Sequence, residues 1–283
     1  MIKIERNKLD DIASEYLTKL QDEKGYNKKK DNVIHNHWID NRARIIKSKN
    51  FNAIINEFNA LNQDGFKAFK EYMIGQYEEL FYNRKFGKWL AKKLDVRTCP
   101  YCNRQYTFTV EVGTRDIRPE FDHFHSKSIY PYLALSFFNL IPACPTCNHI
   151  KSDYPIDKNP YFEGFEENFK FKIKTNEGED FTLDWALRNN FVIEFTDSNR
   201  NIDVFALKEL YNEHIDIVKE IIDKAQAYNQ SYYDSLIDSY KGLGKQEADI
   251  ERYVWGNYLE NALHEKRPLS KLTKDILQQL GIK

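Results

Sequence analysis

The sequence predicts an α+β fold, a mostly helical protein with a small antiparallel sheet around a cysteine-rich core. Three observations favour this class. Apolar side chains recur every three or four residues in long segments near both ends of the chain, which is typical of amphipathic helices. Short runs that alternate apolar and polar residues lie between turn-forming segments, as antiparallel strands do. The four cysteines form two C-x-x-C pairs near the middle of the sequence.

The N-terminal region, residues 1–95, is predicted to be helical. Its apolar side chains recur at spacings of three and four residues in the segments 9–20, 51–61 and 66–82. Such stripes are most simply the sides of helices that face a core. The run Lys28-Lys29-Lys30 falls in a polar segment, where a solvated turn is the more common role and a phosphate clamp is the alternative.

The middle region, residues 96–160, is predicted to hold a compact core. Segments 105–112 and 117–123 alternate like strands, and a third short strand is expected at 139–143, after a loop and a short helix. A helical turn is expected to begin at Asn148. A strand that ends in Asp-His, followed by another strand and a helix, is the order of a ββα-metal motif.

The C-terminal region, residues 161–283, is predicted to contain a small antiparallel sheet and then helices. Three runs of strand-like character predict the sheet: 169–174, 181–185 and 191–196.

The helices that follow are predicted from their apolar periodicity. A long helix is expected from Asp203 to about residue 228, and further helices at 245–265 and 267–277. His214 lies on the apolar stripe of the long helix, so a core histidine is expected there rather than a metal ligand.

The cysteines carry the strongest chemical signal in the chain. Cys99 pairs with Cys102, and Cys144 pairs with Cys147. Two such pairs complete a four-thiolate tetrahedral site, the usual form of structural zinc. The 41 residues between the pairs exceed the roughly 15 to 20 of a simple zinc ribbon. A folded segment is therefore expected between the two pairs.

This stretch resembles the HNH endonuclease family in its zinc-containing, ββα-metal form. The resemblance rests on Asp122-His123 at the end of a strand, on Asn139, and on Asn148 directly after the second cysteine pair. It implies that His123 is the general base and that Asn139 holds the loop that orients it. It also implies that Asp122 and Asn148 bind one catalytic Mg²⁺ or Mn²⁺, with the neighbouring His149 as the alternative to Asn148.

The chemistry of phosphodiester hydrolysis suits these residue types. The attacking water must lose a proton near neutral pH, and a histidine with an ordinary pKa of about 6.5 can accept it. One hard cation held by side-chain oxygens neutralises charge on the phosphate and on the leaving oxygen. An asparagine ligand leaves such a site less negative than a second carboxylate would.

A wider set of motifs is similar to the nuclease subunits of Septu-type anti-phage systems, the PtuB family, and to their retron-associated relatives. These motifs are FDHFHSKS, LALSFFNLIPACPTCN and the closing segment RPLSKLTKDIL. The resemblance implies an endonuclease that cuts DNA in antiviral defence, acting with an ABC-type, PtuA-like ATPase subunit. Gly242-Leu243-Gly244-Lys245 lacks the spacing of a phosphate loop, so nucleotide hydrolysis is expected of the partner.

Charge is unevenly distributed along the chain. Lys and Arg outnumber Asp and Glu by six in residues 1–100, equal them in 101–160 and fall short by seven in 161–283. The basic N-terminal third and the core are therefore expected to hold a polynucleotide, with two solvated helix surfaces as the alternative. The acidic C-terminal third is the candidate surface for the ATPase.

The composition predicts a cytoplasmic protein without membrane segments. No apolar run approaches 18 residues. Charged side chains are spread through the first ten residues, unlike in a signal peptide. Cysteines used as metal ligands favour a reducing compartment.

Three basic residues near the motifs are candidates for phosphate contacts. Arg104 and Lys151 flank the cysteine pairs, and Lys127 follows His123. Ordinary solvated surface is the alternative for each. RNA, for instance transfer RNA, is the alternative substrate, because a ββα-metal site contacts the backbone of the strand. A non-catalytic zinc module that binds nucleic acid or protein is the alternative from another functional class.

Overall fold

The computed structural model describes residues 1–23, 30–83, 85–113, 115–165, 169–179, 190–228 and 230–282. The chain divides into two compact units. The core unit consists of Glu5–Val96 and Thr107–Tyr161. The C-terminal unit consists of Met1–Ile4, Arg97–Tyr106 and Phe162–Lys283. Among these residues helices predominate and each sheet has two antiparallel strands, which confirms the predicted α+β class.

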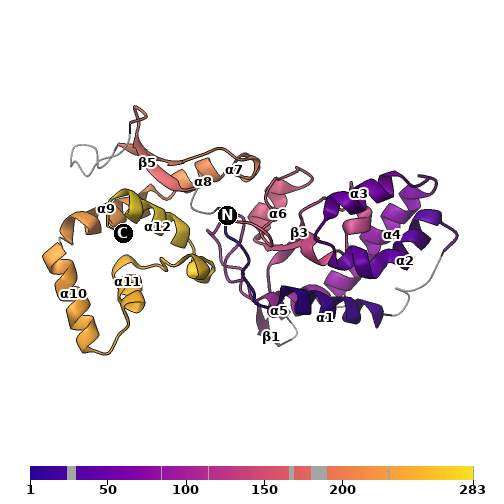
Figure 1. Cartoon of the computed structure of the whole chain (residues 1–283), viewed down its shortest axis with the longest axis horizontal. Helices are drawn as coiled ribbons and strands as arrows, with labels where there is room; N and C mark the ends of the chain where they lie inside the picture. The colour runs from indigo at the N-terminus through magenta and orange to yellow at the C-terminus, as the bar shows by residue number, and fades with distance from the viewer. Residues whose placement is uncertain are drawn as a thin grey trace. The chain divides into compact units, whose positions relative to one another are not determined.

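The first part of the core unit is a set of helices, drawn in indigo to purple in Figure 1. The apolar stripes of the sequence coincide with their buried faces, such as Ala13, Tyr16 and Leu20 in the first helix. Asn32 and Asn50 cap two of the helices by accepting hydrogen bonds from backbone N–H groups. The helices are α1 (Leu9–Gln21), α2 (Val33–Lys47), α3 (Phe51–Asn59), α4 (Phe66–Glu78), the π-helical turn η1 (Glu79–Asn83) and α5 (Phe86–Leu94).

The second part of the core unit is a short strand pair followed by a helix. Strand β3 (Glu120–His123) pairs antiparallel with β4 (Leu140–Ala143), with Asp122 opposite Ile141. Helix α6 (Pro145–Lys151) follows β4 and contacts β3. The expected short helix before β4 is two 3₁₀ turns, η2 (Pro131–Leu133) and η3 (Phe137–Asn139).

The strands of this region are shorter than the sequence predicts. Segment 105–112 forms a strand only over β1 (Val110–Val112), which pairs with β2 (Arg115–Ile117). The expected strand 117–123 is interrupted after β2, and β3 begins after Pro119. A proline has no N–H to donate to a ladder, which accounts for the break.

Hydrogen bonds join the N-terminal helices to the segment around β4. Trp38 Nε1 donates to the Tyr132 carbonyl over 3.0 Å, and the Ser136 hydroxyl donates to the Ile45 carbonyl over 2.8 Å. Both side-chain donors are buried, so the contacts belong to a shared core. Residues 1–95 and 96–160 thus do not form two consecutive units, because most of both lies in the core unit.

The described part of the C-terminal unit contains a strand pair and a series of helices. Strand β5 (Phe171–Thr175) pairs antiparallel with β6 (Phe191–Phe195). The strand expected at 181–185 lies outside the described residues. The helices are α7 (Arg200–Val204), α8 (Leu207–Asn212), α9 (Ile215–Ala227), α10 (Gln230–Gly242), α11 (Glu247–Trp255), the 3₁₀ helix η5 (Asn261–Lys266) and α12 (Ser270–Gln279).

The predicted long helices of this unit are wrong in their continuity. The helix expected from Asp203 to 228 is three helices, because Ala206 has a left-handed backbone with φ of 47° and His214 begins a new helix as its N-cap. The helix expected at 245–265 ends at Gly256, whose φ of 73° suits glycine. In the described part of the chain, no helix has the length and apolarity needed to cross a membrane.

Candidate functional site

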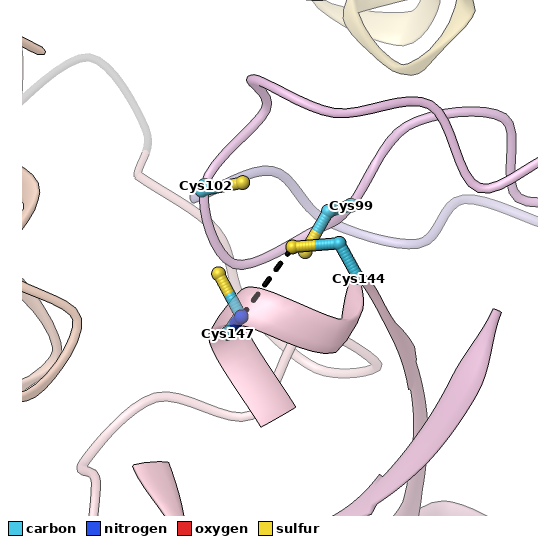
Figure 2. A group of neighbouring side chains, drawn as sticks. All are labelled: Cys99, Cys102, Cys144 and Cys147. Carbon is cyan, nitrogen blue, oxygen red and sulfur yellow. Dashed lines mark hydrogen bonds between the residues drawn. The ribbon is translucent and has the colours of Figure 1, made fainter. Parts of the chain in front are cut away.

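The four cysteines form a buried cluster. The Sγ atoms of Cys99, Cys102, Cys144 and Cys147 all lie within 4.8 Å of one another, and all four thiols are free of disulfides. Figure 2 shows their sulfur atoms pointing toward a common centre. A search of the described residues for groups of at least three Cys, His, Asp or Glu side chains that could hold a metal ion finds this cluster.

The local backbone of the first pair suits a metal-binding turn. Asn103 adopts a left-handed conformation with φ of 47°, which asparagine tolerates better than most residues. Its N–H donates to the Cys99 carbonyl over 2.7 Å, and the N–H of Arg104 donates to Cys102 Sγ over 3.4 Å. A sulfur that accepts a backbone N–H is better suited to carry the negative charge of a thiolate.

The second pair begins helix α6. Cys144 is the N-cap of this helix, and its sulfur accepts the N–H of Cys147 over 3.5 Å. Pro145 stands at the first helical position, where its missing N–H costs no helical hydrogen bond. The C-P-T-C sequence therefore specifies both the turn of the cysteines and the start of the helix.

The donor set fits a zinc ion. Thiolates at about 2.3 Å from zinc in a tetrahedron lie roughly 3.8 Å from one another, and the four sulfurs lie within 4.8 Å. Complete burial of the four side chains corresponds to a closed site without a water ligand, as structural zinc has. The sequence-based prediction of a four-cysteine metal site is confirmed to this extent.

His123 ends strand β3 and is buried. Its Nε2 lies 3.0 Å from the Ala134 carbonyl oxygen, which can only accept, so Nε2 carries the hydrogen and Nδ1 is the basic nitrogen. The Tyr77 ring packs edge-on against the imidazole at 4.5 Å between centroids. Burial, followed by the positive charge of Lys127, lowers the pKa of His123 to about 3.

Asp122 and Lys151 form a buried ion pair beside His123. The Lys151 ammonium lies 3.3 Å from Asp122 Oδ1 and donates to the His123 carbonyl over 2.7 Å. Lys151 is completely buried, although it stands in the last turn of α6. The sequence allowed two interpretations of Lys151, a phosphate contact and a solvated surface residue. Both are wrong, because the buried ammonium reaches neither solvent nor a surface position from which it could contact a phosphate.

Asn148 is partly exposed on α6 and is held by a residue of β3. Its Nδ2 donates to Glu120 Oε2 over 2.7 Å, so Oδ1 is the amide atom that could bind a cation. Asn148 lines a pocket together with Asp122 and His123. His149 is exposed and does not line that pocket. The geometry therefore favours Asn148 over His149 as the residue that could bind a cation together with Asp122.

Asn139 is completely buried and holds the loop after His123. Its Oδ1 accepts the N–H of His125 over 2.7 Å, while its Nδ2 donates to the carbonyls of His125 and Leu133, each over 3.0 Å. A short side chain that makes three hydrogen bonds to backbone fixes the path of the chain on both sides. Asn139 thus orients the segment that carries His123 and Ala134.

The pocket beside these residues, here called the site pocket, has a volume of about 180 Å³. Several lining residues were missed by sequence reasoning, namely Tyr77, Tyr82, Ser126, Ser152 and Asp153. Ser126 donates a hydrogen bond to Asp153, which lowers the pKa of that carboxyl. The signal for Asp153 was its position at the end of the CNHIKSD motif, whereas nothing local marks Tyr77 or Tyr82.

Two other basic candidates differ in what they contact. Lys127 lines the site pocket, with its ammonium 5.2 Å from the centroid of the Tyr77 ring. Arg104 belongs to the C-terminal unit, and its Nε donates to Nε2 of His214 over 2.8 Å. His214 is half-buried at the start of α9, where burial and then the Arg104 charge lower its pKa. Among Arg104, Lys127 and Lys151, Lys127 is the residue that lines the site pocket.

The first cysteine pair is also tied to the end of the chain. The N–H of Leu269 donates to the Asn103 carbonyl over 2.7 Å, and Asn103 Nδ2 donates to the His264 carbonyl over 3.1 Å. Tyr211 donates its hydroxyl to the Cys102 carbonyl over 2.5 Å. All of these residues lie in the C-terminal unit, so the closing segment supports the C-x-x-C turn.

Comparison of the chain with protein-family models, with curated proteins and with solved structures found no match.

Proposed function

We propose that this chain is a metal-dependent HNH endonuclease that hydrolyses phosphodiester bonds of DNA. The observation that carries the proposal is one pocket lined by Asp122, His123 and Asn148, at the end of β3 and beside α6. A carboxylate, an imidazole and an amide oxygen around one small polar cavity supply a cation site and a proton acceptor together.

His123 is the general base of this proposal. The hydrogen bond from Nε2 to the Ala134 carbonyl fixes the tautomer in which Nδ1 can take a proton from water. Burial keeps the imidazole neutral at physiological pH, with Nδ1 unprotonated. Asn139 acts as the positioning residue, because its three hydrogen bonds to backbone hold the loop that carries the Ala134 carbonyl.

Asp122 and Asn148 are the residues that would hold a catalytic Mg²⁺ or Mn²⁺. Both supply oxygen, the donor that these cations prefer, and a magnesium ion bound by one or two protein groups takes its remaining ligands from water and phosphate. When bound, the cation neutralises the charge that develops on the scissile phosphate. Lys151 holds Asp122 Oδ1 in place, and Glu120 orients the Asn148 amide.

Lys127 is the phosphate-binding residue that the geometry favours. It lines the site pocket and is only partly buried, so its ammonium can approach a phosphate oxygen. Lys151 is completely buried and Arg104 binds His214, so neither is proposed for this contact. Lys127 would then supply a second positive charge to a backbone phosphate, in addition to that of the cation.

Structural zinc is proposed for the four-cysteine cluster, because the donor set and its burial fit that ion. Cysteines that serve as metal ligands also favour a reducing compartment, and we place the activity in the cytoplasm on that ground. The wider proposal is the nuclease effector of a Septu-like anti-phage system that acts with a PtuA-like ABC-type ATPase. It rests on the motifs given above rather than on the pocket.

Purified protein incubated with plasmid DNA and with total RNA, each with magnesium or manganese, separates the candidate functions. Nicking or linearisation of the plasmid supports the proposal, and cleavage of RNA alone moves the substrate to RNA. Cleavage of neither, by protein that carries its zinc, favours the non-catalytic zinc module. Co-purification with the product of a neighbouring ATPase gene tests the defence partner.

His123→Gln is the sharpest test of the site. Glutamine keeps a donor for the Ala134 carbonyl but cannot accept a proton near neutral pH, so cleavage should slow by at least about 100-fold. His149→Gln is the matched control, because His149 is exposed and lies outside the site pocket. Equal rates for His123→Gln and the parent protein would refute the assignment of the base. If His149→Ala weakens metal-dependent cleavage more than Asn148→Ala does, His149 rather than Asn148 is the cation ligand.

A further inference from the structure

The π-helical turn η1 brings two tyrosines to one side of the chain. A π-helix bonds residue i to residue i+5, so residues five apart come onto the same side. Tyr77, in α4, and Tyr82, in η1, are five apart, and their rings meet edge to face at 6.3 Å between centroids. Such turns are rare and are found frequently at functional sites. The two rings differ in exposure, since Tyr77 is 4% exposed and Tyr82 is 65% exposed.

Tyr82 stands between two cavities of the core unit. The site pocket is one of them, and a second cavity of about 430 Å³ shares Tyr77, Tyr82 and Phe121 with it. We call this second space the Tyr82 cavity, and its remaining lining residues are Phe81, Asp116, Ile117, Arg118 and Glu120. A molecule in the site pocket therefore lies next to the Tyr82 cavity.

The charges of the Tyr82 cavity disfavour a phosphate. Arg118 is its cation, and this guanidinium lies 3.5 Å from the Asp116 carboxylate. Its Nη1 and Nη2 each donate one hydrogen bond, to the carbonyls of Pro119 and Phe81 respectively. Glu120 adds a second carboxylate, so the lining has two negative side chains and one positive side chain. A phosphate would be repelled there, whereas a neutral group with N–H donors would find acceptors.

The remaining walls suit a flat, apolar surface. The Tyr82 ring is largely exposed, and Ile117 beside the cavity is 67% exposed. The Arg118 guanidinium carbon lies 5.9 Å from the centroid of the Tyr82 ring. An exposed aromatic ring is the platform on which single-stranded nucleic acids stack their bases, and carboxylates accept hydrogen bonds from the N–H groups at base edges.

We propose that the Tyr82 cavity binds an unpaired nucleobase next to the phosphate in the site pocket. The inference rests on the proposed nuclease function and adds a substrate class to it. A base inside a duplex is already stacked and paired, so it cannot reach the Tyr82 ring without leaving the helix. The favoured substrate is a nucleic acid with a single-stranded stretch at the point of cleavage.

Binding of a fluorescein-labelled oligothymidylate, measured by anisotropy in the His123→Gln protein to prevent turnover, tests the subsite. Tyr82→Ala should weaken binding roughly ten-fold, since stacking on one aromatic side chain is of that order. Tyr82→Phe keeps the ring and should bind like the Tyr82 protein. A duplex of the same length should bind equally to all three, because its bases stay stacked.

Abasic substrates test the same contact without a change in the protein. Removal of one base beside the preferred cleavage position should weaken binding to the Tyr82 protein but not to Tyr82→Ala. Unchanged single-strand binding by Tyr82→Ala, or an equal loss for single strand and duplex, overturns the subsite. This outcome differs from failure of the proposed function, in which the parent protein cuts neither DNA nor RNA.

Discussion

Lys151→Met tests whether the buried ion pair of α6 and β3 holds the candidate site together. Methionine preserves the length of the apolar stem, so the substitution removes mainly the ammonium. That ammonium makes a charge-assisted hydrogen bond of 2.7 Å to the His123 carbonyl and lies 3.3 Å from Asp122 Oδ1. Its loss leaves the Asp122 carboxylate buried without this cation.

The expected destabilisation is about 3 kcal/mol. A hydrogen bond to a charged group contributes about 1.5 to 3 kcal/mol, and removal of one partner from a buried ion pair costs about 3 to 5 kcal/mol. The lower part of that range applies because the distance to Asp122 is long for an ion pair. In a unit of this size the melting temperature falls by roughly 2 to 4 °C per kcal/mol, so a decrease of about 6 to 12 °C is expected.

Urea unfolding followed by circular dichroism measures the effect. Lys127→Met is the matched control, because Lys127 is partly exposed and lines the pocket, and its change should stay within about 0.5 kcal/mol. Adding Asp122→Asn to Lys151→Met should restore at least about 1 kcal/mol of the unfolding free energy, because the double variant no longer buries the Asp122 carboxylate. An unfolding free energy for Lys151→Met equal to that of the parent would refute the reasoning.

Two further predictions concern the C-terminal unit and the cysteines. Cys99→Ser should purify with much less than one equivalent of zinc by mass spectrometry and should unfold at lower urea, because structural zinc contributes folding free energy directly; a full equivalent would contradict the four-cysteine site. Burial, then the charges of Lys271 and Lys274, lower the pKa of His264 to about 3. The unfolded chain therefore binds this proton first, and the unfolding free energy falls as the pH drops from about 6.5 towards 3. Between pH 7 and 5, the unfolding free energy of His264→Gln should fall by about 2 kcal/mol less than that of the parent protein. His149→Gln is the control and should follow the parent. Parallel pH profiles of the unfolding free energy for all three proteins would exclude the effect.

Local sequence determined the elements that carry the candidate site. The two C-x-x-C turns depend on residues within a few positions, such as Asn103 with its left-handed backbone and Pro145 at the start of α6. The cysteine cluster was therefore predictable from spacing alone. The pairing of β3 with β4 was also predictable in outline, because the sequence predicts one strand that ends in Asp122-His123 and another directly before the second cysteine pair.

Continuity of the elements was less predictable. Apolar periodicity continues through Ala206 and His214, although the backbone changes direction at both positions. Apolar periodicity indicates which residues face a core. Three short helices around a core can show the same periodicity as one long helix. Pro119 was the one visible signal that 117–123 would not be a single strand.

The surroundings of the site were decided only by the tertiary structure. Lys151 is polar and stands in an exposed-looking helical turn, yet the packing of α6 on β3 encloses its ammonium. Arg104 binds a histidine 110 positions away, and Tyr77 reaches His123 from a helix 46 positions earlier. Spacing rules describe neighbours along the chain, whereas these contacts depend on how separate elements pack. The sequence by itself therefore determined the cysteine turns and the order of strand, strand and helix, and packing alone decided which charges are enclosed and which aromatic rings line the pocket.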